Sequence, residues 1–242
     1  MVVIALNEGE YLRSTVENLQ ATLPADAEIL VVDDGSEDGS TEFLKTAGTR
    51  VRMARAGGLG VARARNWGAR QTTGEVLVFA DAHITLPHGW LPPLLDALTQ
   101  SRVGAVAPAI FDVSTTGTKG FGLYLTGPDL HARWLPRSGQ CPHPAPILPG
   151  CCLAMRRDVF DATGGFDAGL LSRGGVDNEL GIRFWLLGYE LLVVPSVSVG
   201  HLFRPRSPYE VKWTTYLHNA LRLAFVHLSQ ARIDKVMRAL AA

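Results

Sequence analysis

Short apolar runs alternate, in the first part of the chain, with stretches in which apolar side chains recur at helical spacing. The runs lack period-two alternation, which is typical of strands buried on both faces of a sheet. They lie at residues 2–6, 29–32, 76–80 and 103–110, with a weaker strand predicted at 51–53. Apolar spacings of three and four predict helices near residues 12–23, 43–44, 62–70 and 91–98. This alternation predicts an α/β fold with a mostly parallel central sheet flanked by helices.

The regular pattern stops after residue 110. Residues 111–150 are rich in Gly, Pro and aromatic residues without a period, which is more typical of a binding loop than of a simple connection. Farther on, the pattern predicts helices near 156–162 and 177–187, strands at 191–194 and 196–199, and one long amphipathic helix from 209 to 239. We expect a single domain over residues 1–242, made of the halves 1–110 and 111–242.

Chemically active side chains follow three of the predicted strands. They are Asn7 and Glu8, then Asp33 and Asp34, then Asp81 and His83. In sheets of this kind, ligands bind outside the carboxyl ends of the strands. Carboxylates gathered at one edge repel each other unless a cation joins them. The sequence therefore predicts a cation-binding site at this edge of the sheet.

The Asp81-Ala82-His83 motif is the first candidate for metal binding. On extended chain, Asp81 and His83 face the same way, and a carboxylate oxygen with an imidazole nitrogen suits manganese or a similar ion. The alternative is an aspartate that caps the next turn beside a solvated histidine. His201 follows the strand at 196–199 and completes an Asp/His/His set, unless it is only a polar strand end. Arg204 and Arg206, just beyond it, suit phosphate oxygens.

The Asp33–Ser36 segment has two interpretations. One carboxylate can accept hydrogen bonds from a ribose or a base, or the segment can be an Asx-turn that needs no ligand. The chain has no Gly-x-x-x-x-Gly-Lys motif, and Gly57–Gly60 does not complete Gly-x-Gly-x-x-Gly. A nucleotide site that has carboxylates but no glycine-rich phosphate-binding loop indicates that a metal neutralises a bound diphosphate.

Asp177 and Glu179 open a predicted helix. Carboxylates are stabilised by the helix dipole at this position, which would make both residues structural. Either can also serve as a general base in catalysis, so both are candidate catalytic residues.

Composition limits the class of protein. With 47% hydrophobic and 19% charged residues, the 242-residue chain can bury a large core. Lys+Arg and Asp+Glu are 23 each, which argues against a dedicated nucleic-acid partner. Three cysteines, two of them adjacent, predict a reducing compartment, and neither a signal peptide nor a transmembrane segment is expected. We expect a cytoplasmic protein, with docking of its C-terminal helix on a membrane surface as an alternative to docking on the domain.

Several segments resemble known glycosyltransferases. Those similar to family 2 glycosyltransferases are Leu6–Glu8, Asp33–Ser36, Ala64–Gly68 and Gly164–Asp167. Those that resemble the catalytic domain of polypeptide N-acetylgalactosaminyltransferases are Phe79–His83 and Val199–Arg204, with Pro208, Tyr209 and Asn219. The resemblance covers nearly the whole chain.

The resemblance implies the Rossmann-like GT-A fold and transfer of a sugar from a UDP-sugar donor. It implies that Asp81, His83 and His201 hold Mn²⁺, or Mg²⁺, against the diphosphate. The residues expected at the nucleotide are Asn7, Glu8, Asp33, Asp34, Arg65, Asp81, Arg204 and Tyr209. Residues 1–110 then form the nucleotide-binding half, and residues 111–242 complete the metal and acceptor sites. Peptide, glycan and lipid carrier are all open as acceptors.

The two resemblances differ in stereochemistry. Resemblance to family 2 implies inversion of configuration with an aspartate as the general base, a role that would fall to Asp177. The N-acetylgalactosaminyltransferases retain configuration, and the metal motif favours them. Retention is therefore the prediction. The alternatives are inversion with Asp177 as base, a nucleotidyltransferase that shares the fold, and an inactive nucleotide-binding module.

Overall fold

The computed structural model describes residues 1–115, 119–136, 139–210 and 212–241. The strands are β1 (Val2–Ala5), β2 (Ile29–Asp33), β3 (Val51–Arg55), β4 (Val76–Asp81), β5 (Ile84–Thr85), β6 (Val103–Asp112), β7 (Lys119–Gly120), β8 (Leu123–Leu125), β9 (Ala132–Trp134), β10 (His143–Pro144), β11 (Cys152–Arg156) and β12 (Glu190–His201). The helices are α1 (Tyr11–Thr22), the 3₁₀ helix η1 (Glu42–Thr46), α2 (Val61–Arg70), α3 (Leu91–Leu98), α4 (Arg157–Thr163), α5 (Val176–Leu186), α6 (Trp213–His227) and α7 (Gln230–Leu240).

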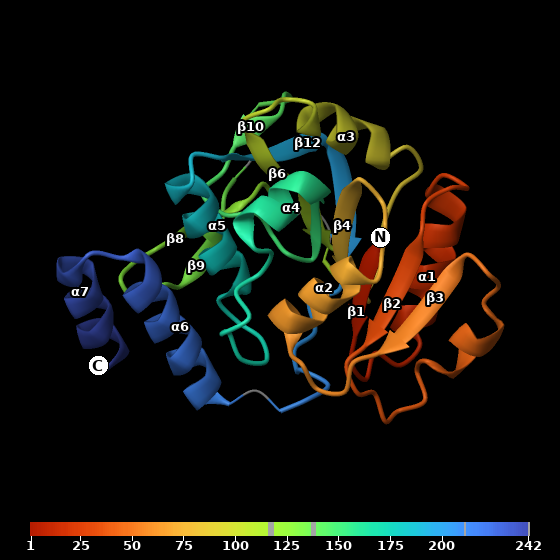
Figure 1. Cartoon of the computed structure of the whole chain (residues 1–242), viewed down its shortest axis with the longest axis horizontal. Coiled ribbons are helices and arrows are strands. Elements are labelled where there is room, and N and C mark those ends of the chain that lie inside the picture. Colours follow the sequence, from red (N-terminus) through yellow and green to blue (C-terminus); the bar gives the residue numbers. More distant parts are fainter. Residues whose placement is uncertain (116–118, 137–138, 211, 242) are drawn as a thin grey trace.

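A central mixed sheet organises the chain, with strand order β10-β12-β6-β11-β4-β1-β2-β3 (Figure 1). The half made of β3, β2, β1 and β4 is parallel, as the sequence predicted. Strand β11 lies between β4 and β6 and is antiparallel to both, whereas β12 runs parallel to β6. The predicted α/β class is confirmed. Strand β11, which directly follows the irregular region, was not predicted.

Helices cover both faces of the sheet because alternate strand residues point in opposite directions. On one face, Val3 and Val31 pack with α1 and α3. On the other face, Val2 and Val32 pack with α2, α4 and α5. Gly68 lets α2 approach closely, since a Cβ at this position would lie 2.5 Å from Cγ1 of Val2. The core therefore consists of two apolar layers that hold the strand ends in place.

The strands predicted at 191–194 and 196–199 form one continuous strand, β12. Its pairing register with β6 shifts between Val194 and Ser198. Pro195 has no N–H to donate, and a register shift accommodates such a residue without ending the strand. The predicted interruption was therefore wrong. The longer strand carries His201 to the same edge as β5, where His201 pairs with Ile84.

The predicted helix from 209 to 239 is two helices, α6 and α7. Leu228 and Ser229 between them have extended backbone, with ψ of 154° and 156°. The break lets the chain reverse, so that α7 lies beside α6 (Figure 1). Leu223 of α6 and Ile233 of α7 therefore join one small apolar cluster. A single straight helix could not bury both. Residue 211, which the predicted helix includes, lies outside the described residues.

In its described residues, the region 111–150 contains only short strands, β7 to β10, together with the end of β6. Strands β8 and β9 form a separate two-stranded sheet. Residues 116–118 and 137–138 of this region lie outside the described part of the chain. In the described segments, no helix is both long enough and apolar enough to cross a membrane.

Candidate active site

A cavity of about 660 Å³ lies at the carboxyl ends of β1, β4 and β12. The predicted site residues that line it are Glu8, Asp34, Arg65, Asp81, His83, Asp177, His201, Arg204 and Tyr209. The structure therefore brings together side chains that are far apart in the sequence. Three other candidates, Asn7, Asp33 and Glu179, lie outside this lining.

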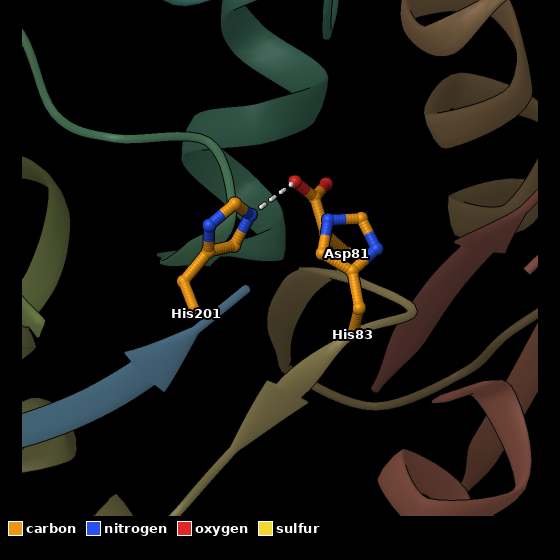
Figure 2. A group of neighbouring side chains, drawn as sticks. All are labelled: Asp81, His83 and His201. Carbon is orange, nitrogen blue, oxygen red and sulfur yellow. Dashed lines mark hydrogen bonds and ion pairs between the residues drawn. The ribbon is translucent and has the colours of Figure 1, made fainter. Parts of the chain in front are cut away.

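Asp81, His83 and His201 form a group with the geometry of a metal site. One potential ligand atom from each residue lies within 4.8 Å of the others. Figure 2 shows the two imidazoles converging on the Asp81 carboxylate, whose Oδ2 lies 3.3 Å from Nε2 of His201. Over residues 1–115, 119–136, 139–210 and 212–241, this is the one group of three or more His, Cys, Asp or Glu so arranged.

The sheet explains why these three residues meet. Asp81 is the last residue of β4, and His83 lies just before β5. Strand β5 pairs with the end of β12, so it brings His201 beside the turn that carries His83. One carboxylate oxygen with two imidazole nitrogens is a mixed donor set that suits a divalent transition metal.

The surroundings of Asp81 keep it ionised. Burial raises its pKa, but the hydrogen bond with His201 and the positive charge of Arg65 outweigh that effect and hold the pKa well below its ordinary value. The guanidinium Nη2 of Arg65 lies 3.3 Å from Oδ1 of Asp81. Metal ligands must be deprotonated, so an ionised Asp81 fits the proposed ligand set.

Arg65 contacts both Asp81 and Asp177 in the lining of the cavity. It is 3% exposed; its Nη2 donates to the Gly150 carbonyl at 2.7 Å, and its Nη1 lies 3.7 Å from Oδ1 of Asp177. Gly150 N–H donates to Oδ2 of Asp177 at 2.9 Å. Burial raises the pKa of Asp177, although Arg65 and the Gly150 N–H partly oppose this. The resemblance placed Arg65 at the nucleotide, and its position beside both carboxylates was not predicted.

Asp34 binds the backbone of the glycine-rich turn before α2. Its carboxylate accepts hydrogen bonds from the N–H groups of Gly58, Leu59 and Gly60 at 3.0, 2.6 and 2.8 Å. Asp34 is 5% exposed and also borders the cavity. Its contacts give it a structural role, and the predicted nucleotide contact remains a prediction.

Replacing Asp34 by Asn is expected to destabilise the fold. The amide keeps one acceptor oxygen but loses the charge that strengthens three hydrogen bonds, at a cost of about 1–3 kcal/mol in free energy of unfolding. Thermal melting should therefore shift downward by roughly 2–4 °C per kcal/mol. An unchanged melting temperature with weakened UDP binding would instead assign Asp34 to the ligand alone.

Asp33 and Asn7 shape the neighbouring turns. Oδ1 of Asp33 accepts from the N–H groups of Gly35 and Ser36 at 3.2 and 2.7 Å, the Asx-turn alternative weighed for this segment. Asn7 has a positive φ of 54°, and its Oδ1 accepts from the Glu37 N–H at 2.9 Å. Both side chains hold the loops after β1 and β2 in place.

Glu179 lies on the buried side of α5, outside the cavity lining. It is 1% exposed, and its Oε1 lies 2.6 Å from Nε of Arg183 and 2.9 Å from Nε2 of His227. These contacts connect α5 to the end of α6. The structure thus places Glu179 outside the cavity lining, whereas Asp177 is part of it.

Asn219 on α6, one of the residues that carry the resemblance, is a positioning contact whose structural role was not predicted. It is 1% exposed and binds the loop before α5 through the Leu171 N–H at 2.8 Å and the carbonyls of Leu171 and Gly174 at 2.9 and 2.8 Å. Ser172 to Gly175 of this loop line the cavity. The sequence signal for this contact was a single asparagine among the apolar residues of α6, since a buried amide needs hydrogen-bond partners.

Solved structures share this architecture and define its class. The crystal structure of GalNAc-T7 with UDP, GalNAc and Mn²⁺ superposes with a TM-score of 0.79 at 26% identity, covering 93% of this chain and 48% of that chain. A mannosyltransferase from Pyrobaculum calidifontis, in complex with GDP-Man and Mn²⁺, gives a TM-score of 0.65 at 18% identity, over 99% and 78%. The fold is the GT-A fold of glycosyltransferases, as the resemblance implied.

Sequence comparison gives the family. The family model of Glycosyl transferase family 2 matches residues 1–164, and the chain belongs to that family. Polypeptide N-acetylgalactosaminyltransferase 11 of Xenopus tropicalis is 32% identical over 95% of this chain and 42% of its own length. Human polypeptide N-acetylgalactosaminyltransferase 15 is 34% identical over 88% and 37%. The chain thus spans less than half the length of these two relatives.

Proposed function

We propose that the protein is a metal-dependent glycosyltransferase that moves a sugar from a UDP-sugar to an acceptor. The observation that carries the proposal is the Asp81, His83 and His201 group inside the cavity. The GalNAc-T7 complex with UDP and Mn²⁺, a structural neighbour of this chain, supports the choice of nucleotide and ion. The relatives' names favour a transferase over the nucleotidyltransferase alternative.

The residues of the cavity have three roles in this proposal. Asp81, His83 and His201 would hold Mn²⁺ or Mg²⁺, which neutralises the diphosphate and stabilises UDP as a leaving group. Arg204 lines the same cavity, and its guanidinium suits phosphate oxygens. Arg65 contacts the carboxylates of both Asp81 and Asp177 and so fixes their relative positions.

We propose retention of configuration. In support, both carboxylate oxygens of Asp177 face partners in the protein, namely the Gly150 N–H and the Arg65 guanidinium. Inversion with Asp177 as base is the second candidate, favoured by its place in the cavity and by the burial that raises its pKa. Proton NMR of the first-formed product separates the two through the anomeric configuration.

The activity test is a screen of UDP-sugars for UDP release. Each donor is incubated in Mn²⁺ and in chelator, without acceptor and with pools of peptides, glycans or lipid carriers. The proposal predicts release for at least one donor, faster with one acceptor pool and abolished by chelator. The relatives' names make UDP-N-acetylgalactosamine and peptides the first pair to examine. Equal release in Mn²⁺ and chelator would contradict metal dependence.

We also propose that residues 203–209 form a lid over the donor. Phe203, Arg204, Arg206 and Tyr209 line the cavity without helix or strand around them. A diphosphate with its metal is a compact charged target that can order such a segment and exclude water. The segment follows His201 directly, so its position would depend on metal occupancy.

Limited trypsin digestion tests the lid. Pro205 blocks cleavage after Arg204, so the exposed Arg206 is the site to follow. We expect cleavage after Arg206 in the free protein and strong protection only with UDP and Mn²⁺ together. Either ligand alone should protect weakly. Full protection of the free protein would show that residues 203–209 are fixed structure.

A further inference from the structure

Glu8 is a buried carboxylate that contacts both parts of the proposed site. It follows β1 and is 6% exposed. Its Oε2 accepts a hydrogen bond from Nδ1 of His83 at 2.9 Å and another from Nη2 of Arg204. One oxygen atom thus joins a proposed metal ligand to the first charged residue of the segment 203–209.

The contact with His83 determines which ring nitrogen is free. A carboxylate oxygen can only accept a hydrogen bond, so Nδ1 of His83 carries the hydrogen. In the neutral ring, Nε2 then has the free lone pair, and Figure 2 shows a ring nitrogen of His83 directed toward Asp81. A carboxylate behind a metal-binding histidine fixes the ring and raises its basicity. Glu8 therefore presents His83 in the form that a metal requires.

The contact with Arg204 holds that side chain against the cavity wall. The Arg204 side chain is 16% exposed, and its guanidinium carbon lies 4.9 Å from the centroid of the Tyr11 ring. A phosphate in the cavity would compete with Glu8 for the same guanidinium. A carboxylate in direct contact with the phosphate would repel it, which argues against the nucleotide contact expected for Glu8 from the sequence.

We propose that Glu8 is a positioning residue for the proposed reaction. It orients His83 toward the metal, and it binds Arg204 until a diphosphate enters the cavity and binds that guanidinium instead. This inference rests on the proposed function. It predicts that loss of Glu8 weakens the effect of metal on UDP binding rather than UDP binding itself. A direct nucleotide contact predicts equal weakening with and without metal.

The test measures the dissociation constant of UDP by calorimetry in Mn²⁺ and in chelator. The ratio of the chelator value to the Mn²⁺ value gives the effect of the metal on UDP binding. Glu8→Ala should reduce this ratio by about 10- to 100-fold, the usual effect of removing a partner of a metal ligand. Its UDP affinity in chelator should be unchanged or tighter, because Arg204 is released. Glu8→Gln keeps an oxygen that accepts from Nδ1 of His83 and should preserve more of the ratio. Glu10→Gln, exposed at the start of α1, is the matched control.

Two outcomes would overturn the inference. The first is a Glu8→Ala ratio equal to that of the wild type, and the second is equal weakening in Mn²⁺ and in chelator. If Glu8→Ala does not fold, Glu8→Gln provides the test. Tighter UDP binding by Glu8→Gln in chelator would support release of Arg204, and weaker UDP binding would contradict it. A wild-type protein without any Mn²⁺ effect would instead overturn the proposed function.

Discussion

Replacing His201 by Ala is expected to abolish most of the metal-dependent affinity for UDP. The substitution removes one of three ligands, so the loss in Mn²⁺ should exceed the about 10- to 100-fold typical of residues that only support a ligand. In chelator, the affinity should stay near that of the wild type, because the cavity is otherwise intact. Calorimetric titration of UDP in both conditions measures the difference.

His88→Ala is the matched control for this substitution. His88 is exposed in the turn before α3, outside the residues that line the cavity. It should behave as the wild type in Mn²⁺ and in chelator. If His201→Ala loses affinity equally in both conditions, or behaves as His88→Ala does, His201 is not a metal ligand.

Gly150→Ala is expected to disrupt the support of the site. A Cβ at residue 150 would lie 2.2 Å from Oδ1 of Asp177 and 2.7 Å from Nη1 of Arg65. Both side chains must therefore move, and Arg65 also contacts Asp81. A displacement of about 1 Å in a site of this kind can reduce catalysis on the order of 100-fold. We expect a loss of that size in UDP release from the preferred donor.

Gly74→Ala provides the control for adding a methyl group. At Gly74 the nearest atom to a new Cβ is the Val76 carbonyl oxygen at 3.5 Å, an ordinary contact. Thermal melting of both variants separates misplacement from unfolding. Wild-type activity in a folded Gly150→Ala protein would mean that the contacts among Gly150, Asp177 and Arg65 do not support the reaction.

The sequence was sufficient where a local pattern determines the structure. The apolar runs located β1, β2, β4 and β6 because buried strands need continuous apolar residues. The rule that active residues follow strand ends then indicated Asp81 and His83, which line the cavity. The Asx-turn at Asp33 was likewise among the alternatives, since it depends on residues two and three positions away.

The sequence was insufficient where a contact joins distant segments. Glu8 and Arg204 are 196 positions apart, and no local spacing relates them. Arg65 was expected only at the nucleotide, and its partners Asp81 and Asp177 could not be inferred because they meet only after β4 and α5 are in place. Glu179 and Asp177 look alike at the start of one helix, yet they point into different environments. Only packing distinguishes the buried ion pair from the cavity residue.

The central claim is that Asp81, His83 and His201 bind the metal that carries the UDP diphosphate. Crystals grown with UDP and Mn²⁺, measured at an X-ray energy where manganese scatters anomalously, locate that ion directly. We predict one anomalous peak coordinated by the Asp81 carboxylate, Nε2 of His83 and Nε2 of His201, with the diphosphate on the same ion. A diphosphate bound in the cavity with the manganese elsewhere, or absent, would contradict the account.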